Sequence, residues 1–118
     1  MPTLKEVIDR VDSNKVNGFS VEEKTTWIST AEMQIAQEIF QTDGAAYDWD
    51  TDQDTELLLG PPFEDIYELY LMAQIDFRQG EFNRYNNELG QFSTRMTDAK
   101  AWYIRKYRPE KKNFRWFY

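Results

Sequence analysis

Residues 61–77 read PPFEDIYELYLMAQIDF, and this stretch decides the fold class. Its apolar side chains recur three and four residues apart, which is the spacing of one face of an α-helix. Pro62 suits the first turn of that helix, where a backbone donor is not needed. An aromatic stripe at helical spacing is more often core than a cofactor site. We therefore expect five rings to be buried: Phe63, Tyr67, Tyr70, Phe77 and Tyr85.

Two capping boxes predict two further helices upstream. Thr3 and Ser20 are each followed three residues later by a glutamate, and such pairs satisfy the free N–H groups at a helix start. Apolar residues then recur at helical spacing in both segments. The first box predicts a helix over residues 3–13, and the second predicts a helix from residue 20 to about residue 40.

Two glycines interrupt the helical pattern downstream, at Gly80 and Gly90. A glycine inside a helix costs about 1 kcal/mol relative to alanine, which packing can override. One kinked helix over residues 62–107 and two helices joined at Gly80 therefore both remain open. Pro109 disfavours helical geometry at the residue before it, so we expect the last helix to end near Tyr107.

These segments predict an all-α fold, a small bundle of three to four helices with a long acidic loop and an extended C-terminal arm. A chain of 118 residues is the size of one domain with a single core. We expect a helical domain over residues 1–107, followed by a basic and aromatic arm over residues 108–118, which we call the C-terminal arm.

The acidic loop is the segment from Gln41 to Gly60, where helical periodicity lapses. Its carboxylates alternate along the chain, as ligands do in a calcium loop. Counted from Asp48, however, the sharp-turn glycine position holds Gln53 and the bidentate glutamate position holds Leu59. We therefore expect no metal site, but a solvated loop with an apolar anchor at its end. The alternating residues are Asp48, Asp50, Asp52 and Asp54.

Four polar residues in the last helical segment also lie three or four positions apart. Such residues share a helix face and form intrahelical pairs worth tenths of a kcal/mol. The expectation is ordinary stabilisation of a helix surface rather than a functional cluster. These residues are Glu81, Arg84, Tyr85 and Glu88.

The sequence contains neither cysteine nor histidine. Their absence removes thiolate chemistry, the commonest general base and the commonest transition-metal ligand. We therefore expect no enzyme, no catalytic residues and no cofactor. No basic-then-apolar leader opens the sequence and its apolar runs are short, so we also expect a protein made inside the cell without a membrane span.

Charge divides the chain unevenly. Residues 1–99 carry 7 basic and 20 acidic side chains, a net charge of −13, whereas residues 100–118 carry 7 basic side chains and one acid, a net charge of +6. An acidic body disfavours nucleic acid as the partner of the basic, aromatic end. Arginine and aromatic residues are typical of protein interfaces. We expect the arm to bind a partner protein through Arg108, Lys111, Lys112, Phe114, Arg115, Trp116, Phe117 and Tyr118.

The stretch from Pro61 to Phe77 resembles a segment of the head-to-tail connector (head-completion or adaptor) proteins of tailed phages and prophages of Gram-positive bacteria. Several short motifs before and after it fit the same family over about residues 5–103. They are Val7-Ile8-Asp9, Asn17, Lys24, Trp27-Ile28, Glu32, Gly80-Glu81, Arg84-Tyr85-Asn86-Asn87 and Phe92.

The resemblance implies a helical subunit of the virion neck, made in the bacterial cytoplasm. Its copies form a ring of twelve between the portal protein and a tail-side neck or tail-completion protein. DNA passes through the ring without specific binding, and no membrane or cofactor is involved. Two alternatives remain open. One is a small acidic regulatory or inhibitor protein that acts by protein binding, and the other is a metal-dependent hydrolase using the carboxylates of residues 48–56.

Overall fold

The computed structural model describes residues 2–15 and 17–107, and 71% of these residues are helical. The prediction of an all-α fold is confirmed. Among the described residues, β-type pairing is limited to one isolated antiparallel bridge between Thr3 and Glu56. The elements are α1 (Leu4–Asn14), α2 (Val21–Ile35), the π-helix η1 (Ala36–Phe40), α3 (Trp49–Asp52), α4 (Asp65–Arg78) and α5 (Phe82–Tyr107).

Both predicted capping boxes are present. The backbone N–H of Glu6 donates to Thr3 Oγ1 at 3.2 Å, and that of Glu23 donates to Ser20 Oγ at 3.1 Å. Each glutamate in turn accepts from the backbone N–H of its capping residue. The reciprocal bonds fix where α1 and α2 begin, so both starts follow from local sequence.

The end of the second helix lies where the sequence predicts it, but its last turn is not an α-helix. The residues after Ile35 form the π-helix η1, and the chain leaves it at Gln41 with a left-handed φ of 56°. Such π turns are usually short insertions in an α-helix.

The acidic loop predicted over residues 41–60 contains one short helix that the sequence pattern did not indicate. Trp49–Asp52 form the short helix α3, because the Asp48 side chain accepts from the Asp50 N–H and caps it. The predicted apolar anchor is confirmed, since Leu57 and Leu59 are buried. The segment also pairs with the N-terminus, where the Leu57 N–H donates to the Pro2 carbonyl at 2.9 Å.

The region from residue 62 to residue 107 forms two helices rather than one. Helix α4 ends at Arg78, Gly80 adopts a φ of 79°, and α5 begins at Phe82. Glycine reaches positive φ without steric cost, which permits the tight reversal here. Gly90 lies inside α5 without ending it, and the described part of α5 reaches Tyr107, the last described residue. The C-terminal arm lies outside the described residues.

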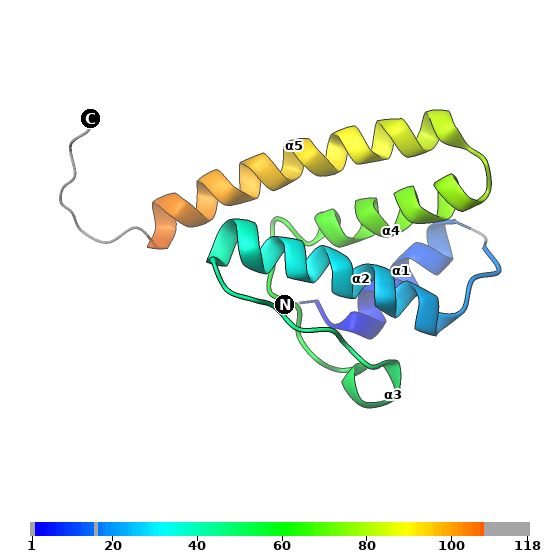
Figure 1. Ribbon diagram of the computed structural model, residues 1–118, viewed down its shortest axis with the longest axis horizontal. Helices are drawn as coiled ribbons and strands as arrows, with labels where there is room; N and C mark the ends of the chain where they lie inside the picture. The colour runs from blue at the N-terminus through cyan, green and yellow to red at the C-terminus, as the bar shows by residue number, and fades with distance from the viewer. Residues whose placement is uncertain (1, 16, 108–118) are drawn as a thin grey trace.

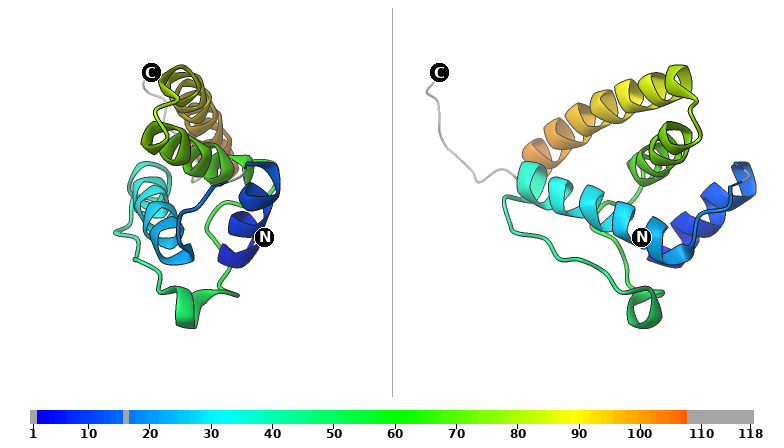
Figure 2. Two further views of the ribbon diagram at one scale, coloured as in Figure 1. Left: turned by 90° about the vertical axis from the view of Figure 1, so that its right-hand side faces the viewer. Right: turned by 45° about the vertical axis from the view of Figure 1, so that its right-hand side comes forward.

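Helix α4 is the centre of the bundle. Seen end-on, it lies above α1 and α2, with α5 along its upper side and the segment that carries α3 below (Figure 2). Helices α4 and α5 run antiparallel over much of their length (Figure 1). The core contains Leu4, Val7, Ile8, Val11, Trp27, Ile28, Ile35, Leu57, Leu59, Phe63, Ile66, Tyr67, Leu71, Ile75, Phe92, Met96 and Ala99.

The predicted aromatic core is confirmed only at its N-terminal end. Phe63 and Tyr67 are buried, whereas Phe77 is 48% exposed. Phe77 is the penultimate residue of α4, and the chain turns back into α5 immediately after it. Helical spacing correctly predicts which face of α4 carries Phe77. The described residues leave this end of the face partly exposed to solvent.

Candidate functional site

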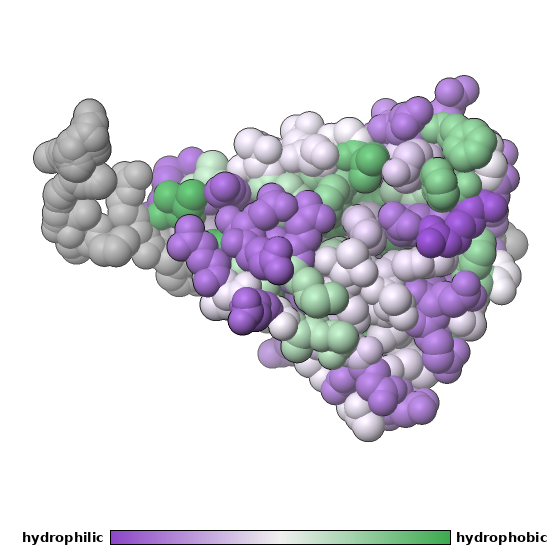
Figure 3. Space-filling view, viewed as in Figure 1, coloured by the Kyte–Doolittle hydropathy of each residue, from purple (hydrophilic) through white to green (hydrophobic). Residues whose placement is uncertain are grey.

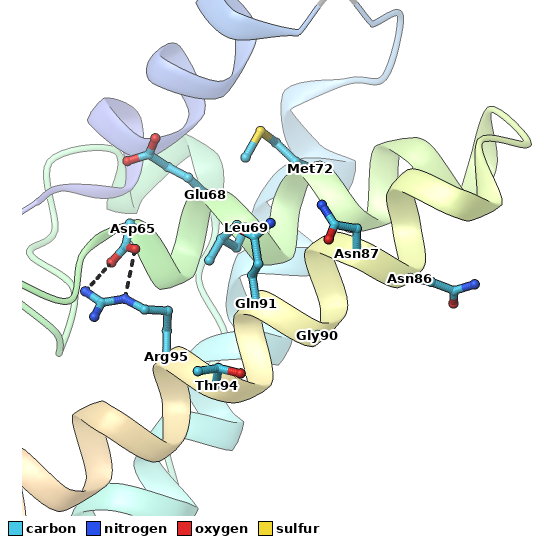
Figure 4. Close-up of a pocket in the computed structure, with 10 residues that line it drawn as sticks. All are labelled: Asp65, Glu68, Leu69, Met72, Asn86, Asn87, Gly90, Gln91, Thr94 and Arg95. Atoms are coloured by element: carbon cyan, nitrogen blue, oxygen red, sulfur yellow. Dashed lines mark hydrogen bonds and ion pairs between the residues drawn. The ribbon is translucent and has the colours of Figure 1, made fainter.

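A groove of about 590 Å³ runs between α4 and α5 (Figure 4). Helix α4 contributes Leu69 and Met72 to it, and α5 contributes a run of residues that begins with two asparagines. We call it the α4–α5 groove. Its lining consists of Asp65, Glu68, Leu69, Met72, Asn86, Asn87, Gly90, Gln91, Thr94 and Arg95.

The groove combines an apolar wall with uncommitted amide groups. The side chains of Asn87 and Gln91 point toward α4, while Asn86 points outward (Figure 4). None of these three amides makes a side-chain hydrogen bond to another described residue. Primary amides can both donate and accept, so Asn87 and Gln91 can pair with the backbone of an incoming peptide.

An ion pair closes one end of the groove. Arg95 on α5 binds both carboxylate oxygens of Asp65 on α4, at 3.0 and 3.1 Å, and donates to the Pro62 carbonyl at 2.8 Å. Its guanidinium also lies 4.9 Å from the centre of the Phe63 ring. Bidentate pairing with a stacked arginine fixes the spacing of α4 and α5 at this end.

Gly90 opens the middle of the groove. A Cβ atom built at this position would meet no atom within 4 Å, so the packing of the described residues does not require a glycine here. Gly90 has a negative, helical backbone conformation, so backbone geometry does not require glycine either. A glycine inside a helix costs about 1 kcal/mol relative to alanine. Gly90 therefore lowers the stability of α5 relative to alanine, and no contact among the described residues explains why a glycine stands there.

A charged cluster joins α1, α4 and α5. Lys15 Nζ lies 2.8 Å from Asp76 Oδ1 and 3.9 Å from Glu88 Oε2. The expectation that Glu88 serves in a surface intrahelical pair is wrong, because its side chain is only 14% exposed and faces another helix. Oε1 of Glu88 is buried and accepts no hydrogen bond from an N–H group or a hydroxyl of the described residues, so its available partner is the neighbouring Asp76 carboxyl group.

Glu88 is suited to hold a proton at neutral pH. Burial away from water, together with a hydrogen bond to the Asp76 carboxyl group, raises the pKa of Glu88 to about 7. Burial acts in the same direction on Asp76, but hydrogen bonds from Glu88 and Lys15 outweigh it and lower the pKa of Asp76. A proton on Glu88 that is shared with Asp76 removes the repulsion between the two carboxylates.

A second buried carboxyl group, Glu32, is fully hydrogen-bonded. Its Oε1 accepts from the Tyr67 hydroxyl at 2.6 Å, and its Oε2 accepts from the Tyr47 hydroxyl at 2.7 Å and the Leu58 N–H at 2.9 Å. Burial, and then the nearby Glu32 carboxylate, raises the pKa of Tyr67, so its hydroxyl keeps the donated proton. This network attaches residues 47–59 to α2 and α4, which is a structural role.

Three aromatic rings form a patch where α4 turns into α5. Phe77 lies 5.8 Å from Phe82 and 5.0 Å from Tyr85 between ring centres, and Phe82 is 56% exposed. At the other end of α5, Ile104 is 44% exposed. Figure 3 shows hydrophobic residues in green near both ends of α5. Exposed apolar groups that gather in a patch commonly mark protein contacts.

The residues singled out in the sequence fall in different places. Asp48 and Asp52 stabilise the short helix α3, because the Asp52 carboxylate also accepts from the Asp48 N–H at 2.8 Å. Across residues 2–15 and 17–107, no three acidic side chains are grouped so that they could hold a metal ion. All the partner-binding residues predicted in the C-terminal arm, from Arg108 to Tyr118, lie outside the described residues.

The groove itself was not predicted. Its sequence signal was present in Asn86-Asn87 and Gly90, a pair of amides followed by a glycine within one helical turn of each other. Hydrophobic periodicity reads the two asparagines as ordinary polar positions and Gly90 as a helix-breaking one. It therefore could not predict the groove, which depends on how α4 and α5 pack against each other.

Comparison with protein-family models, with curated proteins and with solved structures returned no match for this chain. Within the described residues, no helix combines the length and apolar character that crossing a bilayer requires.

Proposed function

We propose that this protein is a subunit of the head-to-tail connector of a tailed phage or prophage and acts by binding other proteins. The observation that carries the proposal is that apolar side chains are exposed at both ends of α5, the Phe77–Phe82–Tyr85 patch at one end and Ile104 at the other. A helix of 26 residues is about 39 Å long, so the two surfaces are far apart.

A closed ring requires two different surfaces on each subunit, because every copy contacts its neighbours head to tail. The two ends of α5 meet this requirement. The aromatic patch of one copy would contact the Ile104 end of the next, and the C-terminal arm would bind the portal protein or a neighbouring subunit. The specific assignment to a phage neck rests on the sequence resemblance.

The net charge supports the same function. Residues 1–99 carry a net charge of −13. A negative wall around a channel repels phosphate groups, so DNA would slide through the ring without binding to it. The same repulsion between copies opposes ring formation in solution, which the portal ring would overcome by acting as a template.

The decisive experiment is light scattering after gel filtration, with and without the purified portal protein. Alone, the chain should be a monomer or a weak oligomer whose association increases with salt, because salt screens like charges. With the portal, electron microscopy should show a ring of twelve copies. A compact dimer that is indifferent to salt and ignores the portal would contradict the proposal and favour the acidic regulatory protein.

Two single substitutions test whether the Phe77–Phe82–Tyr85 patch is the contact between neighbouring subunits. Phe82→Ser should prevent ring formation on the portal while leaving the helical content unchanged, because the ring of Phe82 is 56% exposed. Leu58→Ser is the matched control, since Leu58 is also exposed, at 37%, but lies outside the α4–α5 pair. Equal ring formation by both variants would show that the aromatic patch is not the contact.

A further inference from the structure

The first turns of α5 pack less tightly on the bundle than the rest of the helix. None of residues 82–91 is fully buried, whereas Phe92, Met96 and Ala99 are buried. Segments with few buried apolar contacts open at a lower free energy than the whole fold. The turns of α5 before Phe92 can therefore separate from α4 while the core stays intact.

Gly90 lies at the boundary between these two parts of α5 (Figure 4). Neither packing nor backbone geometry requires a glycine there, because a Cβ atom would meet nothing within 4 Å and φ is not positive. Glycine weakens a helix relative to alanine, and hinge positions are often occupied by small residues. Gly90 is therefore the position at which α5 breaks most easily.

One charged contact fastens the first turns of α5 to the other helices. Glu88 is 14% exposed, and its Oε2 lies 3.9 Å from Nζ of Lys15, the residue that ends α1. Lys15 also binds Asp76 of α4 at 2.8 Å, and the Asp76 side chain is 1% exposed. Among the described residues, the pair with Lys15 is the only ion pair that residues 82–91 make. Without it, these turns rest on α4 through partly buried side chains.

The contact depends on a proton. Asp76 and Glu88 bring two carboxyl groups together, and two negative charges placed side by side repel each other. The charged groups that act on Glu88 from other helices are Asp76 on α4 and Lys15 at the end of α1. Arg84, one turn earlier on α5, also acts on it. Burial and the neighbouring Asp76 outweigh the two cations and raise the pKa of Glu88 to about 7.

We propose that Asp76 and Glu88 form a proton-controlled latch, and that loss of their shared proton lets residues 82–89 detach from α4 about Gly90. In the detached turns Glu88 faces water and ionises near its ordinary pKa of 4.5, so the closed form keeps a proton that the open form releases. Detachment should therefore become on the order of tenfold more frequent between pH 5.5 and pH 7, and change little above about pH 8.

Detachment would divide the aromatic patch. Phe77 belongs to α4, whereas Phe82 and Tyr85 belong to the turns that leave it. The three rings lie together only while the latch is closed. The latch is a property of the free subunit and does not depend on the proposed ring.

Hydrogen exchange measured by nuclear magnetic resonance tests the latch in the free chain. The backbone amides of residues 86–90 bond within the first turns of α5, and those of Met96 and Ala99 report on the part that stays packed. We expect residues 86–90 to be less protected, and their protection to be insensitive to low urea, because partial opening exposes little surface. Equal protection and equal urea dependence along α5 would overturn the inference, since the helix would then open only with the whole fold.

The pH dependence of this exchange identifies the latch. After correction for the intrinsic exchange rate, protection of residues 86–90 should fall on the order of tenfold between pH 5.5 and pH 7. Glu88→Gln cannot ionise and should abolish the fall, whereas Glu81→Gln, at the exposed position immediately before α5, should retain it. Protection that is indifferent to pH in the parent chain, or a fall that persists in Glu88→Gln, would overturn the inference.

Gly90→Ala tests the hinge. The new methyl group meets no atom within 4 Å, and alanine resists leaving the helix, so protection of residues 86–90 at pH 8 should rise about two- to fivefold. Ser93→Ala, at an exposed position of α5 beyond the hinge, is the matched control and should leave this protection unchanged. An equal response to both substitutions would place the break elsewhere and overturn the inference.

Discussion

Glu32 and Glu88 both direct a carboxyl group toward α4, but from opposite sides and into different surroundings. Glu32, on the α2 side, accepts hydrogen bonds from two hydroxyls and one backbone N–H. Glu88, on the α5 side, lies next to a second carboxyl group, that of Asp76, and is paired with it through a shared proton. The carboxylate on the α2 side is therefore satisfied by neutral donors, whereas the carboxyl group on the α5 side depends on holding a proton.

Gly44 and Gly90 also differ in how strongly the surrounding structure requires a glycine. Gly44, which packs on α2, has a φ of 47°, and a Cβ there would lie 3.0 Å from the Cα of Met33. Gly90 on α5 has open space around it. The fold therefore requires the first glycine and not the second. Groups that the fold does not require are the best candidates for function, and they lie on the α5 side.

Loss of the Glu32 carboxylate should give the largest effect. Glu32→Ala leaves the Tyr67 hydroxyl and the Leu58 N–H without their acceptor, and unsatisfied buried groups cost about 1–3 kcal/mol each. We expect the free energy of unfolding to fall by about 3 kcal/mol or more in urea titrations. Glu38→Ala, at an exposed position of η1, is the control and should change it little. Equal effects would contradict the network.

Gly44→Ala should have the second-largest effect and lower the free energy of unfolding by about 2 kcal/mol. The new methyl group meets the backbone of α2, and alanine is strained at positive φ. Gly18→Ala is the control, because a Cβ there meets nothing within 4 Å. The midpoint of thermal unfolding is a sufficient measurement. A shift no larger than that of Gly18→Ala would show that the segment after η1 adapts freely.

The pH dependence of stability tests the α5 side. The pKa of Glu88 is about 7 in the native protein, above its ordinary value of 4.5, so the native state holds a proton that the unfolded chain releases between these values. Stability should therefore decrease as the pH rises from about 5 through 7. The lowered pKa of Asp76 acts in the opposite direction, but only below about pH 4.

Glu88→Gln should remove this decrease. Glutamine cannot ionise, so urea midpoints at pH 5.5 and pH 8 should converge, and the variant should be more stable than the parent at pH 8 by on the order of 1 kcal/mol. Glu81→Gln, at the exposed position immediately before α5, should retain the parental slope. A steep slope that persists in Glu88→Gln would assign the titration to another group.

Gly90→Ala should give the smallest change, and it should be favourable. Alanine is the better helix former by about 1 kcal/mol, and the new methyl group meets no neighbour. Urea unfolding should therefore show a gain of about 0.5–1 kcal/mol. A loss of stability would mean that the glycine serves the packing of α5 after all, and the contrast with Gly44 would disappear.

Sequence reasoning succeeded where the cause is local and failed where it is not. The capping pairs at Thr3 and Ser20 were found because each pair lies within one helical turn. The burial of Phe77 was wrongly predicted, because periodicity gives the face of a residue but not what covers that face. Glu88 was assigned to a helix surface for the same reason.

Local chemistry alone determined that this chain is helical, where its first helices begin, and that its basic end differs from its acidic body. Helicity and helix starts follow from contacts between residues three or four positions apart, and the charge difference follows from composition alone. Only the tertiary structure brought Tyr67 to Glu32, 35 residues away, and Asp76 to Lys15, 61 residues away. The α4–α5 groove is decided at the same level, because a gap between two helices exists only after both have packed against a common core.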